Sequence, residues 1–162
     1  MKKLLLLLLG ITVLACGSDD ADADVVGSDN FFSNHGGKWF YNDNGDFGTY
    51  IGIQKNSGID GSVIIRRITS CADQQSFLLG EDIGQAGDFC ESITRTISLN
   101  TADVLSLNVS VLSGDCDNLV SGNDWTYTLT IDGDVLIETY IHENENPQRL
   151  ILDLYEGEYP CS

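Results

Sequence analysis

Residues 105–111 of this chain read Leu-Ser-Leu-Asn-Val-Ser-Val, with an aliphatic side chain at every second position and a small polar one between. Residues 126–131 (TYTLTI) and 135–141 (VLIETYI) show the same repeat, with Val135 and Ile137 on the apolar side of the second. Successive side chains of a strand point to opposite faces, so a repeat of two predicts strands with one buried face. These stretches predict an all-β fold.

The rest of the chain extends this pattern into one domain. Clusters of Asp, Asn, Gly and Ser separate further candidate strands, which is typical of an antiparallel up-and-down meander. Eight or nine such strands would close into a β-barrel, and a β-sandwich is the alternative. The domain is expected over residues 36–162. Beyond the three alternating segments, strands are expected at 38–42, 47–55, 62–69, 75–79, 93–99 and 148–155.

The hairpin between the last two alternating segments sets which side chains face the core. A two-residue turn at Asp132-Gly133 would place Glu138 opposite Tyr127, and hence a charge on the apolar face. A three-residue loop, with Gly133 in the left-handed conformation, pairs Tyr127 with Ile137 instead. We predict the odd loop, because a slip of one residue inverts every side chain of a strand.

The chain begins with the features of a bacterial export signal. Lys2 and Lys3 precede an apolar run that is too short to span a bilayer. The tetrad Val13-Leu14-Ala15-Cys16 resembles the lipobox of bacterial lipoproteins. The resemblance implies a signal peptide over residues 1–15 and a lipid anchor on Cys16, whose several acyl chains attach the protein firmly to a membrane.

Residues 16–35 are predicted to form a disordered acidic tether. Small and acidic residues dominate its first half and cannot bury enough apolar surface to offset the entropy of ordering. A flexible coil from Gly17 to Asn30 would reach about 20 Å. Within it, Ser18-Asp19-Asp20 resembles the acidic export signal of surface lipoproteins in the Bacteroidota. That resemblance implies an outer-membrane lipoprotein exposed on the cell surface.

The mature chain would be strongly acidic. Lys2 and Lys3 leave with the signal peptide, so 6 of the 8 basic residues remain against 25 acidic ones, and the net charge becomes −19. This field repels nucleic acid, so no nucleic-acid partner is expected. The charge suits a soluble exported domain, and we expect a monomer.

Four cysteines remain beyond Cys16, and an even number in an oxidising compartment predicts two disulfides. A zinc site is disfavoured because the chain has no C-x-x-C pair and neither histidine is spaced as a ligand. In a meander of nine strands, Cys71 lies at the same end as Cys161 and Cys90 at the same end as Cys116. Eight strands would leave Cys161 at the wrong end, and proximity along the chain favours Cys71 with Cys90, so the pairing stays open.

The first expected strand carries a second resemblance. Gly37-Lys38-Trp39 is similar to the G-x-W signature of lipocalin-type barrels, in which the Trp packs across the closed end. Residues 71–77 (CADQQSF), followed by Cys90, resemble the lipocalin-like domains of Bacteroidota lipoproteins. The resemblance implies a binding module for a small apolar or amphipathic ligand. Candidate ligand-lining residues are Trp39, Trp125 and Tyr140.

No catalytic constellation is recognisable, and neither an enzyme nor a cofactor is expected. His35 and His142 are far apart in sequence and are interpreted as surface histidines without a nucleophile beside them. The oxygen-bearing side chains of Asn42, Asn44 and Asp46 are weak calcium candidates, although their composition is also that of a turn.

An accessory surface lipoprotein is the alternative function. Such a protein would hold no internal ligand and would bind a protein or a glycan through its loops. The candidate loops are residues 80–91 and 113–123.

Overall fold

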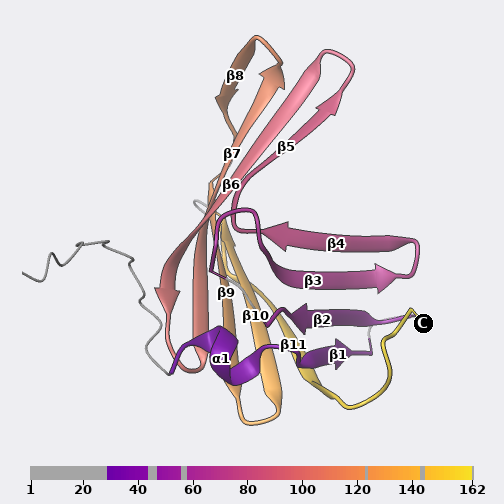
Figure 1. Cartoon of the computed structure of the whole chain (residues 1–162). Coiled ribbons are helices and arrows are strands. Elements are labelled where there is room, and N and C mark those ends of the chain that lie inside the picture. The colour runs from indigo at the N-terminus through magenta and orange to yellow at the C-terminus, as the bar shows by residue number, and fades with distance from the viewer. Residues whose placement is uncertain (1–28, 44–46, 56–57, 123, 143–144, 162) are drawn as a thin grey trace, which may run out of the picture.

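The protein is a nearly closed antiparallel β-barrel with one short helix, as a computed structural model shows (Figure 1). The structure describes residues 29–43, 47–55, 58–122, 124–142 and 145–161. The predicted signal peptide, Cys16 and the first part of the tether lie outside these residues. The elements are α1 (Phe31–His35), β1 (Trp39–Asn42), β2 (Thr49–Ile53), β3 (Val63–Ser70), β4 (Asp73–Leu78), β5 (Gly80–Ala86), β6 (Phe89–Asn100), β7 (Val104–Asp115), β8 (Asn118–Ser121), β9 (Trp125–Asp132), β10 (Val135–His142) and β11 (Gln148–Tyr155).

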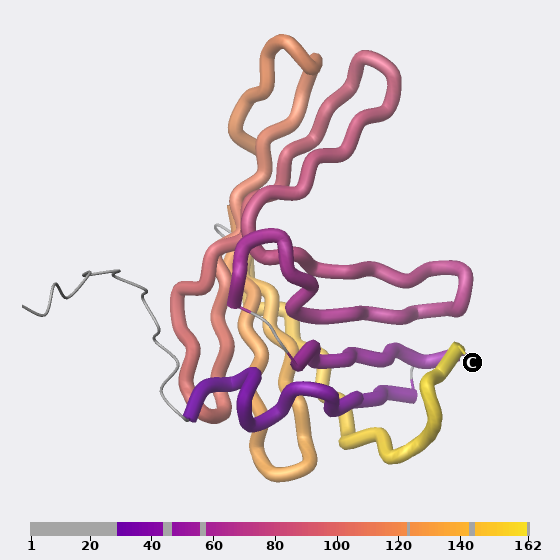
Figure 2. Tube along the Cα trace, in the orientation of Figure 1, coloured from indigo at the N-terminus to yellow at the C-terminus, as the bar shows by residue number. Residues whose placement is uncertain are grey.

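The strands form a single sheet in the order β4-β3-β2-β1-β11-β10-β9-β7-β6-β5, with β8 added to β7. The first strand therefore pairs with the last, and the two edges of the sheet are β4 and β5, which only Leu79 separates in the chain. Gly80, with φ of 88°, lets the backbone pass from one edge to the other. The all-β barrel is confirmed, and all nine predicted positions hold strands, but the described chain has eleven strands. Figure 2 shows the path of the chain through the barrel.

The two additional strands, β5 and β8, correct the expectation of loops at 80–91 and 113–123. There β6 and β7 run on past the barrel and pair with β5 and β8, giving a four-stranded extension that we call the arm, residues 80–92 and 112–121. Figure 1 shows it projecting from one end of the barrel. Most arm residues are exposed, so the sequence carries no alternation that would reveal a buried face.

The barrel interior is built from the inward faces that the alternation predicted for β7 and β9. Leu105, Leu107 and Val109 of β7 are buried beside Tyr127 and Leu129 of β9. The main core comprises Phe31, Phe32, Phe40, Ile51, Ile53, Ile64, Ile65, Leu79, Leu105, Leu107, Val109, Val111, Tyr127, Leu129, Ile131, Leu136 and Leu152.

Helix α1 belongs to the domain, although the sequence placed residues up to His35 in a disordered tether. Phe31 and Phe32 are both buried in the core, and apolar burial of this size offsets the entropy of ordering. Asn30 caps the helix by accepting a hydrogen bond from the Ser33 amide at 2.9 Å. The Phe31 amide donates to Asn100 Oδ1 at 3.0 Å. Residues 30–35 therefore belong to the folded domain.

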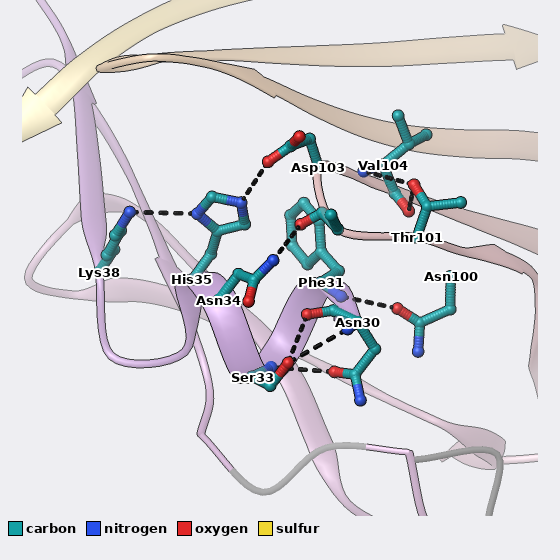
Figure 3. A network of polar contacts seen from close by, with 11 residues as sticks. Asn30, Phe31, Ser33, Asn34, His35, Lys38, Asn100, Thr101, Asp103 and Val104 are labelled. Carbon is teal, nitrogen blue, oxygen red and sulfur yellow. Dashed lines mark hydrogen bonds and ion pairs between the residues drawn. The ribbon is translucent and has the colours of Figure 1, made fainter. Parts of the chain in front are cut away.

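His35 fastens α1 to the turn between β6 and β7, as Figure 3 shows. Its ring lies 3.1 Å from Lys38 Nζ on the Nδ1 side and 3.1 Å from Asp103 Oδ1 on the Nε2 side. Because the lysine ammonium can only donate, Nδ1 accepts its hydrogen bond, and the protonated Nε2 donates a hydrogen bond to Asp103 Oδ1. His35 is buried and structural, which corrects its interpretation as a surface histidine. The helix thus closes the end of the barrel opposite the arm.

The hairpin between β9 and β10 differs from the odd loop that we predicted. Asp132 pairs with Val135, so the turn has two residues, Gly133 and Asp134. This register turns Val135 and Ile137 outward and places Glu138 inside the barrel, fully buried. The prediction was wrong because it assumed that the interior would exclude a charge.

Both predicted disulfides are present, in the pairing that nine strands favoured. Cys71 bonds to Cys161, with 5.4 Å between the Cα atoms, and ties the C-terminal tail to the β3–β4 hairpin. Cys90 bonds to Cys116, with 4.9 Å between the Cα atoms, and links β6 to the residue after β7 within the arm.

Candidate functional site

A partly enclosed cavity of about 230 Å³ lies inside the barrel, in the half nearer the arm. Strands β4, β6, β7, β9 and β10 contribute its walls. Three larger hollows, of about 650, 580 and 340 Å³, are more open to solvent. The cavity differs from them because it is less open and because aromatic and aliphatic side chains make up most of its lining. Its lining residues are Gln75, Phe77, Arg95, Leu107, Val109, Trp125, Tyr127 and Tyr140.

A buried polar network centred on Glu138 lies against this cavity. Tyr127 and Tyr140, which line the cavity, donate hydrogen bonds to Glu138 Oε1 at 2.9 and 2.8 Å. Arg67 of β3 approaches the same oxygen, with 3.7 Å between Nε and Oε1. Three strands thus supply the groups that stabilise the carboxylate in an apolar interior, as a buried charge requires.

The two phenols stay protonated well into the alkaline range. Burial raises the pKa of Tyr127 well above the usual 10.0, and the neighbouring Glu138 carboxylate raises it further. The pKa of Tyr140 is raised by the same two causes, with burial again the larger. Both hydroxyls therefore act as permanent donors toward Glu138 at physiological pH.

Arg95 brings a second cation to the cavity wall. Its side chain is only 10 % exposed, and the guanidinium lies over the Phe77 ring, 5.3 Å from the centroid. Its one acidic neighbour, Asp82, lies 3.9 Å away from Nη1 and is 45 % exposed. Burial lowers the pKa of Arg95, and Asp82 raises it in part. The group still carries its charge at neutral pH, because a guanidinium titrates far above it.

Several buried atoms of this interior form no hydrogen bond with any residue that the structure describes. They are Arg95 Nη1, Arg67 Nε and Glu138 Oε2, of which the two nitrogen atoms take part only in the longer ion pairs given above. A buried polar atom without a hydrogen bond costs about 1–3 kcal/mol, and more when the group is charged. Arg95 is the one of these three residues that lines the cavity, so a polar group from outside the chain can be accommodated beside it.

The cavity brings together two of the three predicted ligand-lining residues. Trp125 and Tyr140 both line it. Trp39 does not, because Phe40 is the β1 residue that faces inward, so Trp39 lies on the outside with its ring over Gly52 and against Tyr159. Phe31 and Phe32 of α1 occupy the closed end, where the resemblance placed the tryptophan.

The calcium candidates form no site that the structure describes. The side-chain amide of Asn42 donates to the Ile151 carbonyl, while Asn44 and Asp46 lie outside the described residues. Within the described ranges no three His, Cys, Asp or Glu side chains are grouped as metal ligands. His142 stacks on Trp125, with 5.3 Å between the ring centroids, and lies at the other end of the barrel from His35.

Sequence reasoning missed the two charged residues that distinguish this cavity. Arg95 lies between Ile93 and Ile97 at alternate positions of β6, and Glu138 lies between Leu136 and Tyr140 of β10. Each is a single charge on the otherwise apolar face of a strand. That pattern is compatible with a buried charge and equally with a shifted strand register. Only the interaction partners on other strands distinguish the two explanations.

Comparisons with known proteins reveal no relative, since the chain matches no family model, no curated protein and no solved structure. In the part of the chain that the structure describes, no helix has the length and the hydropathy needed to cross a membrane. Function is therefore inferred from the chemistry of the site.

Alkaline solution is expected to destabilise the protein through Tyr127 and Tyr140. Because both phenols have a raised pKa when folded, only the unfolded chain loses these two protons above about pH 10. Their contribution is constant below that pH, and above it the free energy of unfolding falls by about 1.4 kcal/mol per pH unit for each retained proton. Urea unfolding measured at several alkaline pH values gives the slope. Tyr140→Phe should reduce the slope of the free energy of unfolding against pH by the contribution of one proton. An unchanged slope in this variant would contradict the role given to Tyr140.

Proposed function

We propose that the chain is a lipid-anchored binding module of lipocalin-like type, which holds a small apolar or amphipathic ligand in the barrel cavity. The observation that carries the proposal is the partly enclosed cavity of about 230 Å³, whose lining combines aromatic rings with the buried Arg95. Ligand sites are typically concave and apolar, with a few placed polar groups. The volume lies below the usual range of about 300–1,000 Å³ for drug-sized ligands, so the ligand is small.

Filling the cavity tests this function directly. Val109 lines the cavity, so Val109→Phe occupies part of its volume, while Val120→Phe adds the same bulk on the exposed arm. Native mass spectrometry of protein purified from its own host should detect a retained ligand in the wild type and in Val120→Phe. The ligand should be absent from Val109→Phe, whose fold is checked by near-UV circular dichroism. Equal retention by both variants would refute the cavity as the site.

The proposed anchor rests on the lipobox resemblance at Cys16. Intact mass spectrometry should find acyl chains on Cys16 of the processed chain, and Cys16→Ser should release the protein from the membrane fraction. Ser18→Ala is the matched control and should leave the chain acylated. Protease added to intact cells should degrade the domain if it faces the medium. A wild-type chain that lacks acyl groups would exclude the anchor.

The arm favours a second candidate function, the binding of a protein with a basic and partly apolar surface. Ile83, Phe89 and Val120 are exposed on the arm, where strands β5 and β8 each pair with a single described strand. Arm residues 80–92 and 112–121 include six acidic side chains and no Lys or Arg. By the strand register, Phe89 and Val120 lie on one face of the arm and Ile83 on the other. Exposed apolar side chains together with a uniform charge are typical of an interaction surface.

A pair of surface variants tests this second candidate. Ile83→Ser with Val120→Ser reduces the apolar area of the arm, whereas Ile151→Ser changes an exposed residue of β11 outside it. Cross-linking on intact cells should give an adduct that the arm variant loses and the Ile151 variant keeps, and whose yield falls with added salt. An adduct that survives in the arm variant would rule the arm out.

A further inference from the structure

The cavity contains a charged donor without an acceptor. Arg95 Nη1 is buried and forms no hydrogen bond in the described protein. Asp82 lies 3.9 Å from that atom, whereas a charge-assisted hydrogen bond between nitrogen and oxygen is about 2.7–2.9 Å long. The ion pair therefore leaves the guanidinium of Arg95, a residue that lines the cavity, with a hydrogen-bond donor that no described group satisfies.

We propose that the cavity binds a small monocarboxylic acid with an apolar, ring-sized body, and that Arg95 donates hydrogen bonds to the carboxylate. This inference rests on the proposed ligand-binding function and specifies the chemistry of the ligand. The planar guanidinium matches a carboxylate in a bidentate arrangement, and its position 5.3 Å from the Phe77 ring centroid places it beside the aromatic wall of the cavity.

The charges around the cavity favour one negative charge on the ligand. Glu138 is already stabilised by two phenol donors and by Arg67. Arg95 has only the half-exposed Asp82, which water solvates. A monoanion therefore completes the charge balance of the interior. A dianion would leave one charge unpaired near the Glu138 carboxylate, at a high cost in a medium of low polarity.

The lining and the volume set the rest of the ligand. A cavity of about 230 Å³ corresponds to roughly seven or eight water molecules at about 30 Å³ each. Phe77 meets Tyr127 edge-to-face at 5.5 Å, and Tyr127 meets Tyr140 at 4.9 Å, so ring faces and edges surround the space. Such walls suit a ring or a short branched chain and offer too few polar groups for a sugar.

Phenylacetate and its neutral isostere phenylacetamide test the inference, with calorimetry as the readout. The wild type should bind phenylacetate at least tenfold more tightly than phenylacetamide. Arg95→Gln should lose that preference and bind both equally weakly, because a hydrogen bond to a charged group contributes a difference of this order. Arg66→Gln is the matched control, since Arg66 is an exposed arginine of β3 outside the cavity, and it should behave as the wild type.

The outcomes separate this inference from the proposed function. If the acid and the amide bind the wild type equally, or if Arg95→Gln keeps the preference, the carboxylate assignment is overturned and the apolar binding function stands. If neither compound binds, and neutral indole also fails to bind, both are overturned. Arg95→Lys, which keeps the charge and loses the planar fork, should show an intermediate preference and covers the case in which Arg95→Gln does not fold.

Discussion

Glu138→Ala is expected to lower the free energy of unfolding by about 3–5 kcal/mol, as breaking a buried charge cluster does in other proteins. The substitution removes the acceptor of two phenol hydroxyls, of which Tyr127 is fully buried. It also takes the anionic neighbour from Arg67, whose side chain is 26 % exposed and keeps part of its hydration. The phenols therefore contribute most of the loss. Urea denaturation monitored by circular dichroism measures it.

Two further variants make this prediction specific. Glu138→Gln keeps a carbonyl oxygen for the phenols and should cost only about 1–2 kcal/mol. Glu156→Ala, at an exposed position, should change stability by less than about 0.5 kcal/mol. If Glu138→Ala were no more harmful than Glu156→Ala, the carboxylate would not be integrated in the core as described.

Removing the disulfide between Cys71 and Cys161 is expected to destabilise the protein more than removing the one between Cys90 and Cys116. The first closes a sequence separation of 90 residues and the second one of 26. The entropy that a cross-link removes from the unfolded chain grows with the length of the loop, which gives about 4–5 kcal/mol for the first and about 3–4 kcal/mol for the second. Double Cys→Ala variants under urea measure both values.

Removal of the two disulfides should also affect different parts of the protein. Without Cys90 and Cys116 the arm should exchange its amide hydrogens faster, while the barrel stays protected. Without Cys71 and Cys161 the tail still contacts the barrel, since Tyr159 donates to Gln74 Oε1 at 2.9 Å. The opposite order of stability losses would show that native contacts outweigh chain entropy here.

Alternation in the sequence was sufficient to predict the strands that surround the core. Segment 105–111 predicted β7, and its aliphatic residues do face inward. The positions of the cysteines relative to these strands left the disulfide pairing open between eight and nine strands, and the structure has the pairing that nine strands favoured. Both results follow from local geometry, because the period of a strand does not depend on its partners.

Glu138 marks the limit of that reasoning. From the sequence of β10 alone, a charge between Leu136 and Tyr140 argues for turning the strand over, and Val135 and Ile137 offer a second apolar face. The native register is fixed by partners on other strands, Arg67 of β3 and Tyr127 of β9. Contacts between residues so distant in sequence cannot be inferred from one strand.

The arm and α1 escaped prediction for other reasons. Both faces of the arm are largely exposed, which removes the periodicity that marks a half-buried strand. Helix α1 has only five residues, too few to show a period of 3.6. The adjacent Phe31 and Phe32, which are the first aromatic residues of the sequence, were the available signal that the tether had ended.

Strand β6 runs from the arm to the end of the barrel where α1 packs. Its 12 residues extend over about 40 Å at roughly 3.3 Å each. A chain attached to a lipid surface through residues preceding α1 is consequently attached at the end of the barrel that α1 closes. The half of the barrel that contains the cavity then lies on the side away from the point of attachment, and the arm lies beyond it.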